Sequence, residues 1–303
     1  MAPEYGERVS PDTDSRCYRH PDRVSYTLCQ RCGRTICGEC QTPGPVGVLC
    51  PECVAEARRG YAQSQPVSLQ AARLARRWAG QPVVTYSLIG ICVVVFLVQL
   101  LGGAAVTNAL LFAPVQAVPA FGLFEPWRMI TAVFVHSPTP PYLHLLLNML
   151  TLFIFGRVLE PALGRLQYAV LFVLAGFGGS AAVLLWGLVM PATLLSPVVG
   201  ASGAIFGLMG AFAVILHSTG RGATQFYVLI AVNLVIGFLP GFNVSWQAHV
   251  GGLVVGLLFG LILVRTRARR QLRARWWLIG ALAAVLVLVS VVVCVLLTAI
   301  FAR

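Results

Sequence analysis

Residues 84–103 read VTYSLIGICVVVFLVQLLGG, a run without a charged side chain. An α-helix needs about 20 consecutive apolar residues to cross the hydrocarbon core of a bilayer. The composition of the whole chain agrees, because 58% of its 303 residues are apolar and only 11% are charged, whereas soluble domains are roughly a quarter charged. The run therefore predicts a membrane-spanning helix in an all-α, multi-span protein.

More apolar runs follow this first one, and together they predict a polytopic membrane helix bundle. A six-helix core is expected over 83–264, and an Arg-rich cytoplasmic loop with a seventh helix over 265–303. A long connection, 104–141, separates the first two spans, and its aromatic side chains place it partly in the membrane interface, with Trp127 at headgroup depth. The further spans are expected at 142–159, 166–189, 199–218, 224–240, 247–264 and 277–300.

The residues before the first span are polar and fall into three parts. Residues 1–15 are expected to be a disordered tail. Residues 16–55 hold a cysteine-rich domain, and residues 56–82 form a basic linker against the membrane surface. A cleavable signal peptide is not expected from these polar residues.

Arginine distribution predicts how the chain crosses the membrane. The net charge is +12, and all 22 basic residues are Arg. Cytoplasmic loops carry the excess of positive charge, which places the N-terminus in the cytoplasm and the C-terminus outside. Arg beside apolar spans indicates contact with a lipid bilayer and makes nucleic acid an unlikely partner, while the absence of Lys hints at a GC-rich bacterial genome. The arginines that alternate with the spans are Arg157, Arg165, Arg221, Arg265, Arg267, Arg269, Arg270, Arg273 and Arg275.

Four polar residues inside the predicted spans are functional candidates, because polar side chains at membrane depth are costly. His144 and Asn148 lie in the second span, Ser202 in the fourth and His249 in the sixth. With the predicted orientation, His144, Ser202 and His249 all fall near the outer end of their helices. Asn148 lies one turn below His144 on the same helix face. Side chains from three helices can therefore converge on one pocket.

These residue types fit nucleophilic catalysis. A serine hydroxyl becomes a useful nucleophile when a neutral imidazole takes its proton, which assigns these roles to Ser202 and His249. Asn148, His144 and the backbone N–H of Ser202 can donate to an oxyanion. No acidic residue lies in the third to seventh spans, so the pair is a dyad without a carboxylate, and catalysis needs no cofactor.

Small residues explain how the fourth and sixth spans approach each other. Gly203 and Gly207 on one helix, and Gly252 and Gly256 on the other, are spaced so that helix backbones can touch. Phe206 lies one turn after Ser202 and can pack against the imidazole of His249. Two further histidines, His136 and His217, are expected at the membrane interfaces, away from this group.

Residues 84–264 resemble the rhomboid family of intramembrane serine proteases. The resemblance implies that Ser202 is the nucleophile, that His249 is the general base, that His144, Asn148 and the Ser202 N–H line the oxyanion hole, and that Gly200 shapes the turn before Ser202. It also implies that single-span membrane proteins are the substrates and are cut near the outer face. The matching residues are Trp127-Arg128, His144, Asn148, Gly200-Ala201-Ser202-Gly203 and Ala248-His249 followed by Gly251-Gly252.

Two other functions compete with the protease. A non-catalytic relative of the same fold would bind transmembrane helices as an adaptor or chaperone, and it would tolerate loss of Ser202 or His249, both of which are present. A transporter or channel is disfavoured, because it calls for charged residues at mid-membrane, which the third to seventh spans lack.

The cysteine-rich domain has the spacing of two structural zinc sites. Disulfides are rare in the reducing cytoplasm, where the predicted topology places this segment, so zinc is favoured over disulfides. Ligand pairs at such short spacing usually interleave, as in B-box-type zinc fingers, which the segment resembles. A cytoplasmic protein is a candidate partner of this domain. The expected ligand sets are Cys17, His20, Cys37 and Cys40 for one ion, and Cys29, Cys32, Cys50 and Cys53 for the other.

Overall fold

A computed structural model describes residues 15–44, 46–63, 81–220, 224–236 and 244–302. The chain divides into two compact units, Met1–Ala79 and Gly80–Arg303. Residues 1–14 of the tail predicted for 1–15, and most of the linker predicted for 56–82, lie outside the described residues.

The first unit is a small head with little regular structure. A 3-10 turn, η1 (Gly38–Cys40), is followed by a short hairpin of β1 (Thr42–Pro43) and β2 (Val48–Leu49), in which Thr42 pairs with Leu49. Helix α1 (Pro51–Gln63) then runs from the predicted cysteine-rich domain into the predicted linker. In the described part of the head, the fully buried cluster consists of cysteines and Ile36. Such a core buries little apolar surface, so other forces must hold the head together.

The second unit confirms the predicted helical membrane bundle. Five of its helices are long and apolar enough to span a bilayer, and two apolar helices, α7 and α8, are shorter. The end of the predicted fifth span, beyond residue 236, lies outside the described residues. The helices of the bundle are α3 (Val83–Leu110), α5 (Leu143–Leu163), α6 (Arg165–Trp186), α7 (Ser202–Ser218), α8 (Thr224–Ile236), α9 (Trp246–Arg265) and α10 (Leu272–Phe301).

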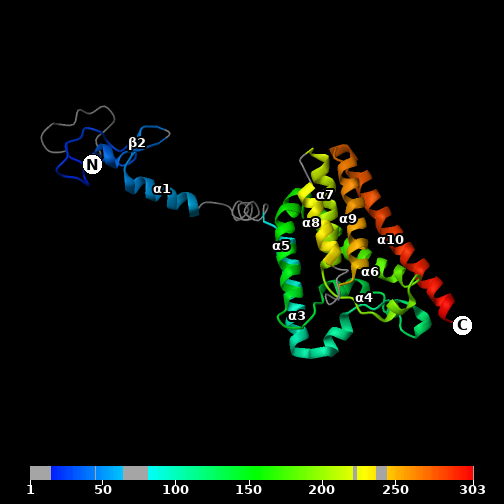
Figure 1. The fold of residues 1–303 in the computed structure, drawn as a ribbon. Helices are drawn as coiled ribbons and strands as arrows, with labels where there is room; N and C mark the ends of the chain where they lie inside the picture. The colour runs from blue at the N-terminus through cyan, green and yellow to red at the C-terminus, as the bar shows by residue number, and fades with distance from the viewer. Residues whose placement is uncertain (1–14, 45, 64–80, 221–223, 237–243, 303) are drawn as a thin grey trace. The chain divides into compact units, whose positions relative to one another are not determined.

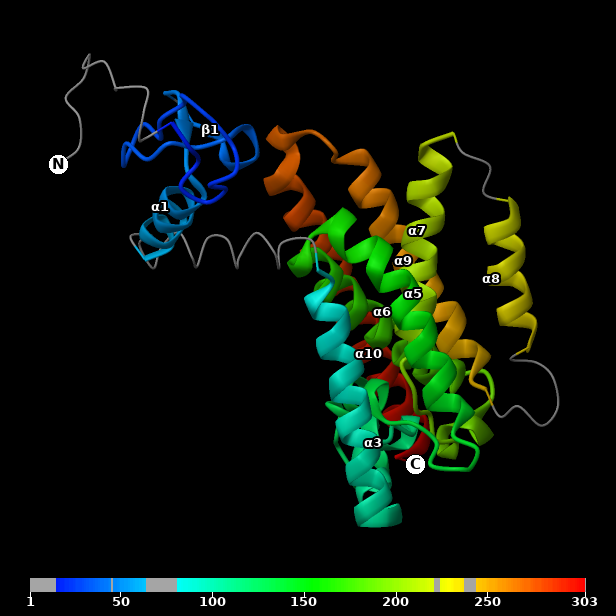
Figure 2. The ribbon, with the colours of Figure 1, turned by 90° about the vertical axis from the view of Figure 1, so that its left-hand side faces the viewer.

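Helices α7 and α9 form the centre of the bundle and pack side by side, with α6 against both (Figures 1 and 2). Helix α5 contacts α7 and carries α3 on its other side, α10 contacts α6 and α9, and α8 packs beside α7 (Figure 2). Large side chains that are wholly buried, among them Tyr168, Phe172, Leu208 and Phe259, fill the space between the helices. The central position of α7 explains how a short helix can belong to a membrane bundle: ten of its residues are buried against protein.

Several predicted helix ends differ from the observed ones: α5 ends at Leu163 instead of residue 159, and α10 begins at Leu272 instead of residue 277. Glycines explain two further differences. The first helix was expected to end at residue 103, but α3 bends at Gly103 (φ 63°) and continues to Leu110. The fourth span was expected to begin at residue 199, but α7 begins at Ser202. Gly200 has a φ of +115°, a conformation that favours glycine and lies outside the helix. The segment before Ser202 is therefore a turn.

The long connection between α3 and α5 is folded against the end of α3. Its short elements are the 3-10 turns η2 (Pro114–Ala117), η3 (Pro119–Phe121) and η4 (Ala132–Phe134) and the single-turn helix α4 (Arg128–Thr131). Arg128 donates to the carbonyl oxygens of Asn108 and Leu111 and pairs with Glu125 at 2.7 Å. These bonds satisfy carbonyls that the end of a helix leaves free, so the connection is a fixed part of the bundle.

Candidate functional site

The bundle brings Ser202 and His249 into direct contact. Ser202 is the first residue of α7, and His249 lies in the first turn of α9. The Oγ of Ser202 lies 2.9 Å from Nε2 of His249, within hydrogen-bonding distance. His144 and Asn148 lie near the start of α5, which begins at the same end of the bundle. The candidates from three helices therefore share one region.

Glycines allow this contact by letting the helix backbones touch. A Cβ atom at Gly252 would fall on the carbonyl oxygen of Gly203, and one at Gly256 would fall on that of Gly207. The third helix approaches as closely, since a Cβ at Gly179 of α6 would lie 2.9 Å from the Ala248 carbonyl oxygen. The backbones of α6 and α7 thus touch α9 at Ala248, the residue before His249. Helix packing therefore fixes the position of the imidazole.

The imidazole of His249 is held by an aromatic ring. Phe206 stacks on it, with ring centroids 4.2 Å apart and planes at 18°. His249 is only 6% exposed. Its Nδ1 is buried and has no hydrogen-bond partner in the described part of the chain. The orientation of the ring therefore rests on stacking and on its bond to Ser202.

No carboxylate accepts a hydrogen bond from His249 among the described residues. Of the two acidic residues in the bundle, Glu125 pairs with Arg128. Glu160 is buried and accepts hydrogen bonds from the backbone N–H groups of Val84 and Thr85 at 2.8 and 2.7 Å. Glu160 thus caps the start of α3. The sequence reasoning assigned it no role.

A hydrogen bond to Nδ1 of His144 leaves Nε2 as the nitrogen that carries the proton of the neutral ring. The backbone N–H of Ser137 donates to Nδ1 of His144 at 3.1 Å, so the proton of a neutral ring is assigned to Nε2. A Cβ at Gly200 would lie 2.8 Å from Nε2 and Cε1 of His144. The donor edge of His144 therefore faces the turn before Ser202, and only a residue without a side chain fits there.

Asn148 lies below His144 and keeps part of its amide available. Its Nδ2 donates to the carbonyl oxygen of His144 at 2.7 Å, which uses one of two N–H groups. Asn148 is 8% exposed. As the first residue of α7, Ser202 has a backbone N–H that the helix itself does not bond. A base, a hydroxyl and several N–H donors in one place are the groups that acyl transfer requires.

The expectation that His136 lies apart from this group was wrong. Its side chain is completely buried, and its ring centroid lies 5.3 Å from that of His144. Gln99 of α3, itself 1% exposed, accepts from the His136 N–H at 3.2 Å and donates to the His136 carbonyl oxygen at 2.9 Å. Burial, together with His144, lowers the pKa of His136 to about 4, so this ring is neutral at pH 7. Gln99, a polar side chain among the apolar residues in the middle of the first span, was the signal for this link.

The other histidine, His217, lies at the opposite end of α7. It is exposed, and its Nδ1 lies 3.2 Å from the hydroxyl of Tyr227 on α8. It takes no part in the group around Ser202.

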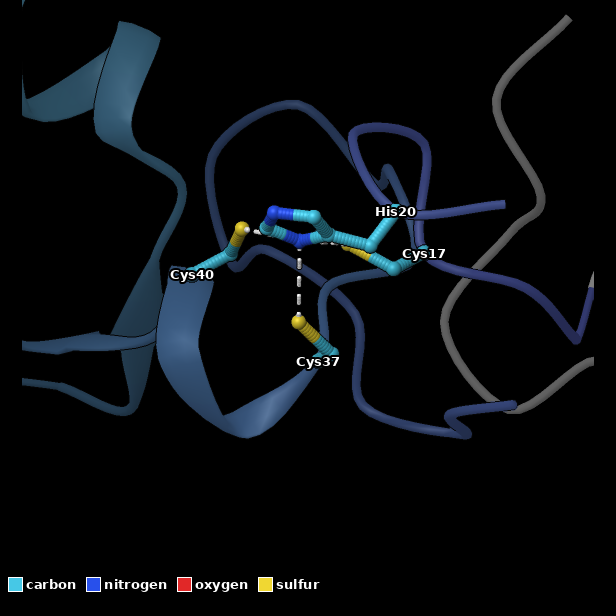
Figure 3. A group of neighbouring side chains, drawn as sticks. All are labelled: Cys17, His20, Cys37 and Cys40. Carbon is cyan, nitrogen blue, oxygen red and sulfur yellow. Dashed lines mark hydrogen bonds between the residues drawn. The ribbon is translucent and has the colours of Figure 1, made fainter. Parts of the chain in front are cut away.

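The cysteine-rich head contains two groups of residues that could each hold a metal ion. In each group the ligand atoms lie within 4.8 Å of one another. Figure 3 shows the first, in which Nδ1 of His20 lies 3.8, 3.3 and 3.4 Å from three cysteine sulfurs. The structure brings together the same two interleaved sets that the spacing predicts: Cys17, His20, Cys37 and Cys40 in one, and Cys29, Cys32, Cys50 and Cys53 in the other.

These distances fit a tetrahedral metal centre. Sulfurs bound to zinc at about 2.3 Å in a tetrahedron lie ~3.8 Å apart, and the Sγ atoms of Cys32 and Cys50 are 3.7 Å apart. The backbone N–H of Cys50 also donates to Sγ of Cys29 at 3.1 Å. Such outer bonds orient metal ligands. The head therefore has the donor set and the geometry for two ions.

Comparison with known proteins places the bundle among rhomboids. Residues 123–266 match the family model described as "Rhomboid domain". "RHOMBOID-like protein 6, mitochondrial" of Arabidopsis thaliana is 38% identical over 149 residues, which are 46% of this chain and 44% of the relative. In Bacillus subtilis (strain 168), "Putative rhomboid protease YdcA" is 31% identical over 151 residues, 48% of this chain and 71% of the relative. "Rhomboid protease GluP" of the same organism is 30% identical over 183 residues, 58% of this chain and 34% of the relative.

These matches cover only part of this chain and part of each relative. The chain spans less than half the length of the Arabidopsis relatives that it matches. The family match includes His144, Asn148, Ser202 and His249 but not the cysteine-rich head. Because the relatives come from a plant and a bacterium, the bacterial origin stays a prediction.

Proposed function

The chain belongs to the rhomboid family, and from that premise we propose that it is an intramembrane serine endopeptidase that cleaves transmembrane segments of other membrane proteins. One observation carries the proposal: Ser202 Oγ and His249 Nε2, on two different helices, lie 2.9 Å apart. Relatives named as rhomboid proteases support the same reaction class.

The proposed reaction begins with a proton transfer. As Ser202 Oγ attacks the carbonyl carbon of the scissile peptide bond, its proton passes to Nε2 of His249. The resulting imidazolium gives that proton to the leaving amine when the C–N bond breaks. Water then attacks the acyl-enzyme with His249 again as base, which releases the acid product and restores Ser202. Without a carboxylate partner, His249 depends on Phe206 and helix packing for its orientation.

The negative charge that forms on the substrate oxygen needs donors aimed at it. The Ser202 N–H, Nε2–H of His144 and the second N–H of the Asn148 amide are proposed to supply them. Gly200 leaves the space that His144 needs. Gly203 and Gly252 hold α7 and α9 at contact distance, so the donors and the base are in position before substrate arrives.

The proposed orientation in the membrane follows from the arginines. The turn between α5 and α6 and the connection between α9 and α10 are the Arg-rich ends and belong in the cytoplasm. The starts of α5, α7 and α9, with Ser202 and His249, then face outward. Cleavage near the outer face of a single-span substrate is the outcome that this placement supports.

Zinc is the metal that best suits the head. Three cysteine sulfurs and one imidazole nitrogen form the first ligand set, and four cysteine sulfurs form the second. Both are usual tetrahedral ligand sets of structural zinc. Zinc in such closed sites supplies folding energy and no chemistry, so the two ions are structural. The proposed role of the folded head is to bind a cytoplasmic protein.

The test is cleavage of a purified single-span substrate by the purified full chain in liposomes. Ser202→Ala and His249→Ala are expected to reduce kcat by at least about 10³-fold, the scale for loss of a nucleophile or its base. The matched control is Ser87→Ala, because Ser87 is a serine of α3 whose hydroxyl donates to the carbonyl oxygen of Val83 within its own helix.

Thermal unfolding of the variants separates chemistry from folding. All three variants should unfold close to the wild-type temperature, and Ser87→Ala should cleave normally. Equal cleavage by Ser202→Ala would overturn the protease assignment. Binding of the substrate helix without cleavage by the wild type would support the adaptor alternative instead.

A further inference from the structure

The seventh helix, α10, has a narrow buried stripe near its C-terminal end. Val293 is 3% exposed and Leu297 is 0% exposed, whereas their neighbours Val295 and Leu296 are 61% and 47% exposed. Farther along, the ring of Phe301 lies 5.3 Å from that of Phe121 in the connection between α3 and α5. Figure 1 shows the end of α10, in red, beside this connection. The stripe therefore packs on protein, whereas Val295 and Leu296 lie on an exposed face.

Val293 and Leu297 share one buried apolar cluster with residues of that connection. Phe112, Met129 and Ala132 belong to it and are 0%, 2% and 3% exposed. The same cluster includes Ala181 and Leu184 of α6 and Leu194 of the turn after it. The C-terminal part of α10 thus closes a core that is separate from the main core of the bundle.

Two members of this cluster also hold the segment that leads into Ser202. Phe112 exchanges both backbone hydrogen bonds with Val198, at 3.2 and 2.7 Å. The carbonyl oxygen of Ala132 accepts from the N–H of Gly200 at 2.9 Å. Gly200 in turn lies against His144 and is two residues before Ser202. A short chain of contacts thus runs from α10 to the turn that sets both Ser202 and the oxyanion donors.

We propose that α10 is a buttress for the catalytic turn, with Leu297 and Val293 as positioning residues. The proposal rests on the proposed protease function, since it concerns the same site. Close packing transmits small shifts, because protein interiors leave little free volume. Removing the Leu297 side chain would leave a cavity in the cluster to which Phe112 belongs, so the strand pairing of Phe112 with Val198 would relax. The turn at Gly200 would then move relative to His144 and His249.

A purely anchoring role for α10 predicts something different. The contacts that bring α7 to α9 are made by glycines of those two helices, and α10 contributes nothing to them. If α10 only anchored the chain in the membrane, shortening a buried side chain of α10 would change cleavage no more than shortening an exposed one. A buttress acts through the buried stripe alone and changes the rate of the chemical step more than the binding of substrate.

The experiment compares Leu297→Ala with Leu296→Ala, its exposed neighbour, in the full chain in liposomes. Leu297→Ala should lower kcat by about 10- to 100-fold, the scale of a misplacement of roughly 1 Å, while KM stays within about twofold. Leu296→Ala should match the wild type. Leu297→Met, which keeps the volume, should restore most of kcat, since volume-conserving changes are tolerated best.

Hydrogen exchange gives a readout that does not depend on cleavage. The amides of Phe112, Val198 and Gly200 should exchange faster in Leu297→Ala than in Leu296→Ala, and amides of α7 beyond its first turn should not change. If the wild type cleaves nothing, the protease proposal fails, and exchange alone decides the buttress. Equal kcat and equal exchange in Leu297→Ala and Leu296→Ala would overturn it. General loss of protection across the bundle in Leu297→Ala, without rescue by Leu297→Met, would also overturn it, because that result marks a stability role.

Discussion

The cysteine-rich head and the helix bundle solve the same problem in opposite ways. Each brings together side chains that are distant in the sequence, Cys17 with Cys40 in the head and Ser202 with His249 in the bundle. The bundle does so by backbone contact at Gly203 and Gly252 and by an extensive apolar core. In the described part of the head the core is almost entirely cysteine. Helix packing thus forms the site of the bundle. In the head, the candidate metal ligands themselves make up most of the core.

This difference predicts opposite responses to metal removal, and here we expect the largest effect. A strong chelator acting on the full chain should abolish the fold of residues 15–63, because structural zinc contributes about 10–16 kcal/mol of apparent binding energy. The bundle should keep its fold and its cleavage activity, since neither ligand set belongs to it. Metal analysis before and after chelation, with hydrogen exchange of both units, measures the two responses together.

The ligand substitution Cys29→Ser provides the matched test, with Cys92→Ala as control. Cys29 belongs to the second metal group, whereas Cys92 is buried in α3 and belongs to neither. If two zinc ions are bound as proposed, Cys29→Ser should lose one of them per chain, and Cys92→Ala should keep both. If the head stays protected from exchange after its metal content has fallen to zero, metal does not hold the head together.

Close packing between α7 and α9 should give the next largest effect. Gly252→Ala places a Cβ on the Gly203 carbonyl oxygen, so α9 must move away from α7. Overpacking of this kind costs about 3 kcal/mol, and the displaced His249 should lower kcat by roughly 100-fold, which corresponds to two steps of 1.4 kcal/mol each. Thermal unfolding and cleavage assays on the full chain check both effects, and zinc content should not change.

The chain offers a control for this substitution in Gly280 of α10. A Cβ there would meet nothing within 4 Å. Gly280→Ala should therefore leave cleavage intact and stabilise the helix by up to about 1 kcal/mol, the difference in helix propensity. If Gly252→Ala cleaves as fast as Gly280→Ala, close helix contact does not position the dyad.

The two regions also differ in how much of their structure could be predicted from the sequence. Ligand spacing in the head predicted the two sets that the structure groups, because four pairs, each with two residues between its members, leave few arrangements. In the bundle, the similar membrane depth of Ser202 and His249 predicted that they lie close together, as they do. Membrane depth gave no information about the connection between α3 and α5, whose path depends on tertiary contacts such as those of Gln99 with His136. The sequence reasoning accordingly misplaced His136.

Glycines limited the sequence reasoning in a second way. A glycine in an apolar run is compatible with a helix, a bend or a turn, and local sequence does not distinguish them. Gly103 bends a helix that continues, Gly200 precedes one, and Gly252 packs inside one. Their surroundings decide among the three, and for Gly200 these are the carbonyl of Ala132 and the ring of His144.

The smallest expected effect tests whether side-chain stacking adds to backbone packing at the dyad. Phe206 stacks on His249 at 4.2 Å, and such a contact is worth about 0.5–1.5 kcal/mol beyond burial. Phe206→Leu should therefore lower kcat by about 2- to 10-fold. Phe212→Leu is the matched control, because Phe212 lies on the same helix but contacts Phe155 and Phe226, at 6.1 and 5.1 Å, away from the site. A dyad oriented by backbone contact alone would lose no more activity in Phe206→Leu than in Phe212→Leu, and the stacked ring would then only fill space.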